Sequence, residues 1–206
     1  MFDEESKDIL NKSVPFWNDT ERVLKQSEQL SGKLVVPAVS ELRYAGRKLV
    51  DFTLSRLNDE DINESKKHIF DYEQCCIRAR HDAVDAAVMY MKTYYMHMIN
   101  EFGIDVVTSS YKYHAELRKA IKVVEERVLI SREERHKRID LYAEINDGCL
   151  TDLIGKFHEL VDSEEVIIGV RGAKDREHKL AVIGIWFGFV GVTLAIIFGL
   201  LGIFLH

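Results

Sequence analysis

An uninterrupted apolar segment near the end of the chain constrains the structure most. Residues Leu180–Leu205 read LAVIGIWFGFVGVTLAIIFGLLGIFL, with no charge, no proline and no amide side chain. As a helix this segment would be about 39 Å long, which exceeds a hydrocarbon core of about 30 Å and leaves room for tilt. A helix buried in a globular domain rarely stays apolar on every face for this length. The sequence therefore predicts a single membrane-spanning helix over residues 180–206.

The flanks of this segment predict its topology. The chain opens with MFDEESKDIL, which is acidic and polar, so we expect no secretory signal. Only His206 follows the apolar segment, and we therefore expect insertion after synthesis, as for a tail anchor. Residues 171–179 form a basic collar that carries Arg171, Lys174, Arg176 and Lys179. Because Lys and Arg collect on cytoplasmic flanks, residues 1–170 are predicted to form a cytoplasmic domain.

The scarcity of proline predicts an all-α fold for this domain. Pro15 and Pro37 are the two prolines of the chain, so no residue after Ala38 forbids a helix. Each proline suits the first turn of a helix. The apolar pattern then predicts helices from Pro15 to about Ser31, ended by Gly32, and from Pro37 to about Arg56.

A third predicted helix is unusually long. It runs from Ile62 to Gly103, capped by Asn58 or Asp59, and would extend for about 60 Å. Its Ala-rich middle suits close helix packing. The cluster MYMKTYYMHM that follows is expected to fill an irregular core, because methionine adapts to gaps.

Two shorter helices complete the predicted domain. The fourth begins after Thr108 or Ser109 and continues to Tyr142 through a solvated charged interval, SREERHKR, until Gly148 ends it. The fifth covers residues 150–161. Beyond it, Gly169 and Gly172 are the expected hinge before the collar. The predicted architecture is one helical bundle, a collar and a transmembrane helix.

Charge and motifs argue against several function classes. The net charge of −6 mixes both signs, unlike the basic field of a nucleic-acid binder. Adjacent Cys75 and Cys76 and the distant Cys149 fit neither a disulfide framework nor a four-cysteine zinc site, and are expected to be reduced, partly buried helix residues. The one Glu-x-x-His pair, Glu133 and His136, falls short of a di-iron set. We therefore predict no enzyme, metal or cofactor.

Small residues recur along the predicted span at intervals of three or four. Such spacing lets membrane helices pack closely, which predicts a homo-oligomer. Thr193 is the polar residue of the span, so a pore would be lined by small side chains and backbone. A passive, lipid-facing anchor is the alternative. The candidate packing positions are Gly184, Gly188, Gly191, Ala195 and Gly199.

A polar cluster interrupts the Ala-rich part of the long helix, at Arg78, Arg80, His81, Asp82 and Asp85. The spacing predicts two bonds along the helix, from Arg78 to Asp82 and from His81 to Asp85. Together with ELRYAGRKLVDF, the sequence CCIRARHDAVDAAVMYMKTYY resembles the HEPN-like helical bundles of bacterial antiphage and CRISPR accessory proteins, over residues 41–95.

That resemblance implies two kinds of function. Many HEPN-like proteins cleave RNA with an Arg-x4-6-His motif, whose one match here joins Arg171 to His178 in the collar, outside the bundle. Other members are non-catalytic and membrane-bound, and we expect this chain to be of that kind. The expected function is an oligomeric effector that alters membrane permeability in antiphage defence, with a protein partner of a defence complex. The alternatives are a tail-anchored adaptor and a membrane-tethered ribonuclease.

Overall fold

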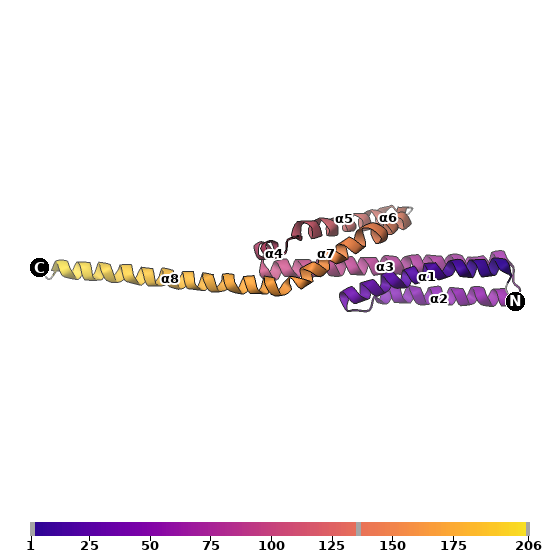
Figure 1. The fold of residues 1–206 in the computed structure, drawn as a ribbon, viewed down its shortest axis with the longest axis horizontal. Helices are drawn as coiled ribbons and strands as arrows, with labels where there is room; N and C mark the ends of the chain where they lie inside the picture. Colours follow the sequence, from indigo (N-terminus) through magenta and orange to yellow (C-terminus); the bar gives the residue numbers. More distant parts are fainter. Residues whose placement is uncertain (1–2, 135–136, 205–206) are drawn as a thin grey trace. The chain divides into compact units, whose positions relative to one another are not determined.

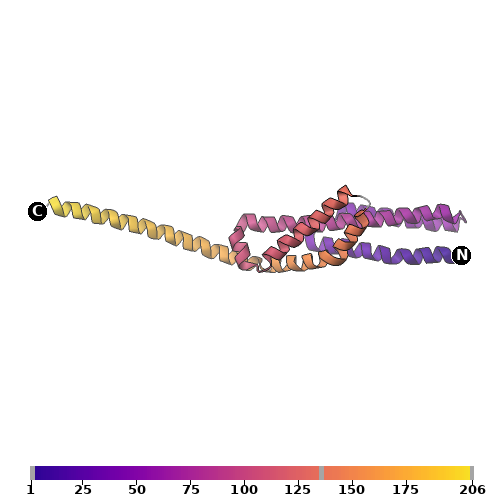
Figure 2. The same ribbon diagram turned by 90° about the horizontal axis from the view of Figure 1, so that it is seen from above.

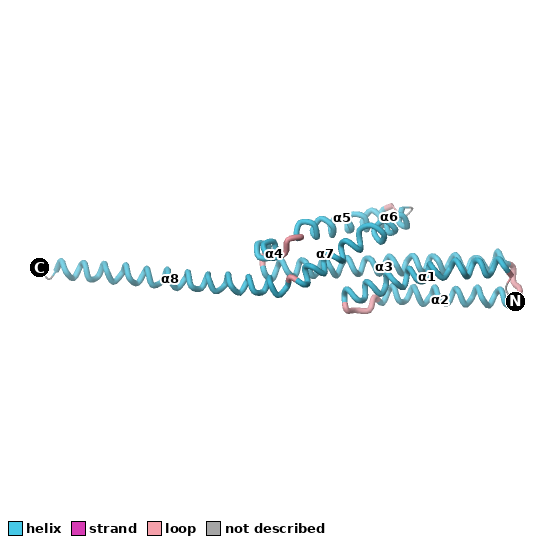
Figure 3. The backbone as a smooth tube through the Cα atoms, in the orientation of Figure 1, coloured by secondary structure: helices cyan, strands magenta, loops and turns pink. Residues whose placement is uncertain are grey.

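The computed structural model describes residues 3–134 and 137–204, without the side chains of residue 147 and of residues 188–204. Every regular element of this part is a helix, as the colours of Figure 3 show. The all-α prediction is therefore confirmed. The elements in chain order are α1 (Glu4–Ser31), α2 (Val36–Leu57), α3 (Ile62–Phe102), α4 (Ile104–Ser110), α5 (His114–Glu133), α6 (Arg138–Glu144), the π-helix η2 (Ile145–Cys149), α7 (Leu150–Asp162) and α8 (Glu164–Phe204).

The chain forms two compact units. The first holds Met1–His97 and Ala115–His158, and the second holds Met98–His114 and Glu159–His206. The first unit therefore contains α1, α2, most of α3, α5, α6 and most of α7. The second contains α4 and α8.

Within the first unit, α1, α2 and the first half of α3 lie side by side (Figures 1 and 2). Each buries a side chain at every seventh position, the repeat that keeps one helix face against its neighbours in a left-handed bundle. Most of these side chains are small, which lets the helix backbones approach closely. The positions are Ser6, Ser13, Thr20 and Ser27 on α1, Ala38, Ala45 and Phe52 on α2, and Ser65, Tyr72 and Ala79 on α3.

Two hydrogen bonds show that α1 and α3 run parallel. The Tyr72 hydroxyl donates to the carbonyl oxygen of Ser13 at 2.6 Å, a pair separated by 59 residues. Further along, the Arg80 guanidinium donates to Asp19 at 2.9 Å, a pair separated by 61 residues. Because the sequence separation stays nearly constant, both helices run in the same direction.

The second helix runs against the other two. At one end of the interface the Ser55 hydroxyl donates to the Ser65 hydroxyl at 2.6 Å, and at the other end Arg78 donates to Glu41 at 3.0 Å. Higher residue numbers on α3 thus meet lower ones on α2. This up-down-up arrangement matches the short connections at residues 32–35 and 58–61.

The core of these three helices centres on Ala45, Tyr72, Cys75 and Cys76, with partly buried Phe16, Trp17, Leu42 and Leu49 packed against it. The cysteines carry free thiols, and Cys149 is partly buried. Burial raises the pKa of the Cys76 thiol, which keeps it protonated. All three cysteines lie on helices as predicted, but Cys75 and Cys76 are fully buried and not partly buried.

The second half of α3 supports α5, α6 and α7, which lie along it in Figure 1. Tyr90 and Tyr94 both meet the ring of Phe157 on α7 edge-on, with centroids 5.8 and 5.2 Å away. Of the expected Tyr/Met core, Met91 and Tyr95 are buried. Met89 is 65% exposed, because it lies on the face towards the groove described below.

The first helix begins earlier than predicted. It starts at Glu4, and Pro15 lies inside it instead of in its first turn. Asp3 is the cap: its carboxylate accepts from the Ser6 amide at 2.6 Å, and this bond, with help from Arg56, lowers the pKa of Asp3 to about 2. Pro15 has no amide hydrogen and so removes one helical hydrogen bond, but α1 continues through it. Gly32, at φ 63°, ends the helix as predicted.

The predicted cap of the long helix was wrong. Asn58 ends α2, where its amide donates to the Leu54 carbonyl at 3.0 Å, and Asp59 takes a positive φ of 55° in the turn. The long helix itself, from Ile62 to Phe102, is confirmed. It stops before Gly103, whose φ of 88° is unfavourable for residues with a side chain.

The predicted fourth helix was wrong in its start and its continuity. Thr108 and Ser109 belong to α4, where their hydroxyls donate to carbonyls inside that helix. A new helix, α5, then begins at His114 and ends at Glu133 within the charged interval. This interval is not wholly solvated, because Ser131 is fully buried.

Three glycines expected to interrupt helices do not. Gly148 lies in η2, a π-turn that continues directly into α7, so the extra residue is absorbed without a break. Gly169 and Gly172 lie inside α8, which is continuous from Glu164 to Phe204. Glycine weakens a helix but does not forbid one, and the expected hinge is therefore absent from the described backbone.

The bond from Tyr72 to Ser13 generates a first prediction. Replacing Tyr72 with Phe keeps the buried ring and removes one hydrogen bond between α1 and α3, so we expect a loss of about 1 kcal/mol of unfolding free energy. Urea unfolding of the full chain in a non-ionic detergent, followed by circular dichroism, measures the change. Tyr44→Phe, at a position 51% exposed, should leave stability unchanged. Equal midpoints for both variants would contradict a stabilising role of this bond.

Candidate functional site

The predicted polar cluster lies at the middle of α3, where its side chains reach other helices. Arg78 donates to Glu41 on α2, and Arg80 donates to Asp19 on α1. The Arg80 guanidinium also lies 4.6 Å from the centre of the Phe16 ring, a cation–π contact. The predicted bond from Arg78 to Asp82 was wrong, because Arg78 bonds Glu41 on α2 instead.

The other half of the cluster faces α5 and α6. The Tyr142 hydroxyl donates to one oxygen of Asp85 at 2.6 Å, and Arg132 donates to the other at 3.0 Å. His81 stacks on the Tyr142 ring at a centroid distance of 3.8 Å. The predicted bond from His81 to Asp85 was therefore wrong. Tyr142 contacts both residues instead: its ring stacks on His81 and its hydroxyl donates to Asp85.

Burial determines the protonation of this cluster. His81 is 4% exposed, and desolvation, reinforced by the charges of Arg138 and Arg80, lowers its pKa to about 3. Desolvation also raises the pKa of Asp82, and of the Tyr142 hydroxyl. A histidine held neutral and a tyrosine held protonated near neutral pH are poor proton shuttles. The cluster joins α3 to four other helices and does not resemble an acid–base pair.

A small cavity borders His81. It has a volume of about 50 Å³ and is lined by residues of α3, α6 and η2, including Ile77, His81 and Asn146. Nδ1 of His81 and Oδ1 of Asn146 are buried without a hydrogen-bond partner in the part of the chain that the structure describes. This volume is that of about one water molecule and is too small for a nucleotide.

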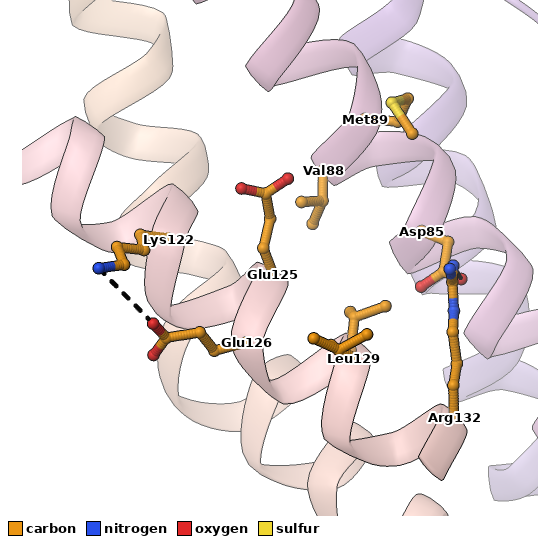
Figure 4. Close-up of a pocket in the computed structure, with 9 residues that line it drawn as sticks. Asp85, Val88, Met89, Lys122, Glu125, Glu126, Leu129 and Arg132 are labelled. Atoms are coloured by element: carbon orange, nitrogen blue, oxygen red, sulfur yellow. Dashed lines mark hydrogen bonds and ion pairs between the residues drawn. The ribbon is translucent and has the colours of Figure 1, made fainter.

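A larger groove of about 470 Å³ lies between α3 and α5, and Figure 4 shows its lining. It contains the apolar side chains of Val88, Met89, Val128 and Leu129. Its charged groups already have partners, since Lys122 pairs with Glu126, Arg132 with Asp85, and Glu125 with Lys92 on α3. The groove therefore suits an apolar side chain of a partner better than an ionic ligand.

In the second unit, the collar is helical and two of its cations are bound by the chain itself. Lys174 pairs with Asp105 of α4 at 2.5 Å, which lowers the pKa of that carboxylate. Arg171 pairs with Asp175 at 3.4 Å and donates to the Phe102 carbonyl at 3.5 Å. Arg176 and Lys179 are exposed, with no ion pair or hydrogen bond among the described residues.

The start of the predicted span is exposed on all sides of α8. Leu180, Ile185, Trp186 and Phe187 are each between 67% and 74% exposed. A Cβ added at Gly184 would meet no atom within 4 Å. Of the other predicted packing positions, Gly188, Gly191, Ala195 and Gly199 lie outside the described side chains. In the described part of the chain, no helix combines the length and the apolar character needed to cross a membrane.

Sequence reasoning located the polar cluster and the collar but not their partners on other helices. Tyr142, Arg132 and Asp105 occupy ordinary positions in their helices and carry no motif. Their roles follow from helix packing alone. Within the described residues, no group of three His, Cys, Asp or Glu side chains is placed to hold a metal ion.

No protein-family model, curated protein or solved structure matches the chain. The resemblance to HEPN-like proteins over residues 41–95 therefore stays a prediction.

The neutral His81 generates a second prediction, on pH. Its pKa is about 3 in the folded chain and 6.5 when unfolded, so the unfolded state binds a proton first as the pH falls. The contribution of His81 to the free energy of unfolding is constant above about pH 6.5. Below that pH it falls by up to about 1.4 kcal/mol per pH unit. His81→Phe keeps the stack on Tyr142 and removes the titration.

Denaturation of the parent and of His81→Phe between pH 7.5 and pH 4.5 measures this effect as the difference between the two curves. We expect the free energy of unfolding of His81→Phe to rise relative to that of the parent as the pH falls. His158→Phe, at an exposed position, is the control and should follow the parent. A difference that does not change with pH would contradict a buried, neutral His81.

Proposed function

We propose that the chain is a membrane-anchored helical effector that oligomerises and alters the permeability of the bilayer, with antiphage defence as its context. Its helical domain faces the cytoplasm, on the side of the basic collar. The last helix crosses the membrane once, over residues 180–206. Neither a cofactor nor a metal takes part.

One observation carries this proposal: the exposed apolar surface of α8 from Leu180 to Phe187. Burying one large apolar side chain is worth about 1.5–3 kcal/mol, so an exposed surface of this kind favours burial against another apolar surface. The sequence continues with apolar residues to Leu205. A bilayer covers every face of such a helix at once, whereas a protein partner would cover one face.

The small residues of the span supply the route from anchoring to permeability. Gly184 and Gly188 stand four apart, as do Gly191 and Ala195, so two copies of the helix can approach at backbone distance. A ring of such helices has no charged side chain in its lining. A pore of this kind would have no fixed ion-binding sites. It would open when water fills its apolar constriction and close when the constriction dries.

A membrane-anchored adaptor is the second candidate, and the groove between α3 and α5 favours it. Met89 and Leu129 line this groove and are 65% and 56% exposed. They offer an apolar partner side chain a place to pack. In this case the span serves only to hold the domain at the membrane.

The ribonuclease alternative receives less support. Of its motif, the Arg171 guanidinium already contacts Asp175 and the Phe102 carbonyl, which leaves fewer donors for a phosphate. His178 lies two helical turns further along α8, about 10 Å away along the axis.

Exchange of the span separates the effector from the adaptor. Ala181–Leu205 is replaced by an unrelated monomeric transmembrane helix of equal length, which keeps the domain at the membrane and removes the glycine surfaces. We expect loss of dye release from liposomes and of cell depolarisation on overproduction. Membrane fractionation shows that the swapped chain stays anchored, and deletion of Leu180–His206 gives the unanchored control. Full activity of the swapped chain would exclude the effector and favour the adaptor, and His178→Ala should be nearly silent.

Substitution of single glycines tests assembly. Gly188→Leu and Gly191→Leu add bulk where close helix approach is proposed, so we expect each to lower the oligomer mass measured by light scattering in detergent. Val182→Leu, a change of similar kind at a position that is already large, is the matched control. An unchanged mass for both glycine variants would leave the span as a passive anchor.

A further inference from the structure

The four cations of the collar do not share one environment. Arg171 and Lys174 are bound by groups of the second unit, namely Asp175, the Phe102 carbonyl and Asp105. These contacts tie α8 to α4 at the Gly103 turn. Their positive charge is largely compensated within the protein.

Arg176 and Lys179 form a second pair of cations on α8. At 100° per residue, Arg176 lies about 200° around the helix from Lys174, and Lys179 lies about 60° from Arg176. Both side chains are exposed, and neither has an ion pair among the described residues. Glu177 is about 100° around the helix from Arg176, and Asp175, four residues before Lys179, is paired with Arg171.

The face of this pair continues into the apolar part of the helix. Ile183 and Trp186 follow Arg176 by seven and ten residues and therefore share its side of the helix. They are 51% and 67% exposed. Two cations, an aliphatic side chain and an indole thus occupy one stripe, about 15 Å long.

We propose that the stripe Arg176–Lys179–Ile183–Trp186 binds the phosphate groups of anionic phospholipids at the membrane surface. The inference rests on the proposed membrane anchor and adds the lipid chemistry that the anchor selects. An indole prefers the level of the headgroups, with its ring in the apolar boundary. Lys179 and Arg176 lie about two and three helical turns above it, and their long stems place the charges at the phosphates.

The charge balance explains why anionic lipid is selected. A zwitterionic headgroup offers no net charge to Arg176 and Lys179, whereas an anionic one adds an attraction that salt screens. Two cations near an anionic surface change a binding constant by roughly 30-fold at most. The already paired Arg171 and Lys174 contribute little to this difference.

Quenching of Trp186 by brominated lipid tests this inference on the full chain in vesicles. The vesicles contain phosphatidylcholine with increasing fractions of phosphatidylglycerol, and either one lipid or the other carries bromine. Trp17 packs against the core of the first unit and contributes a constant, unquenched background. We expect several-fold preferential quenching by brominated phosphatidylglycerol, which declines in 0.5 M salt.

Two double variants with the same loss of charge are compared. Arg176→Gln with Lys179→Gln should abolish the preference, so that both lipids quench equally. Arg171→Gln with Lys174→Gln should retain it. Equal quenching by the two lipids in the unaltered chain would overturn the inference but leave the membrane anchor standing. No quenching by either lipid would place Trp186 outside the bilayer and overturn the anchor as well.

Discussion

Close packing of small side chains at every seventh position is the constraint on which the first unit depends. Ala38 and Ala45 on α2 and Ala79 on α3 are fully buried, and a larger side chain at any of them would push two helices apart. This packing holds the first half of α3 against α1 and α2. The rest of α3 continues straight from that support, and α5 and α7 pack along it. The long helix is therefore the scaffold for the whole unit.

Charged groups in the middle of α3 join the two halves of this scaffold. Arg80 reaches α1, while Asp85 receives bonds from Tyr142 of α6 and Arg132 of α5. Each contact replaces water around a partly buried charge with a partner of the opposite sign or with a hydrogen bond, which burial of a charge requires. His81 avoids this cost by remaining neutral. The cluster specifies which helices meet and at which level, a structural role that needs no bound substrate.

The second unit carries the features that point towards a membrane. Its α8 passes from a collar braced by Asp105 on α4 to an apolar surface that includes the 67%-exposed Trp186. The proposed effector activity and the proposed lipid contacts use different faces and different properties of this helix. Small residues serve contacts between copies, and Arg176 with Lys179 serves contacts with phosphate. The proposed adaptor surface, by contrast, belongs to the first unit.

The sequence by itself determined the helical class, the extent of α2, α3 and α7, and the end of α1 at Gly32. These features depend on local causes: the scarcity of proline, the spacing of apolar residues and the positive φ that glycine tolerates. Tertiary structure decided which charges meet. Arg78 bonds Glu41 and not Asp82. Asp82, four residues along the same helix, competes for Arg78 with carboxylates on the helices packed against α3, and sequence spacing does not reveal those partners. Tertiary structure also decided that the helices continue through Gly148, Gly169 and Gly172. Glycine has a low helix propensity, and the helical residues on either side of each glycine outweigh it.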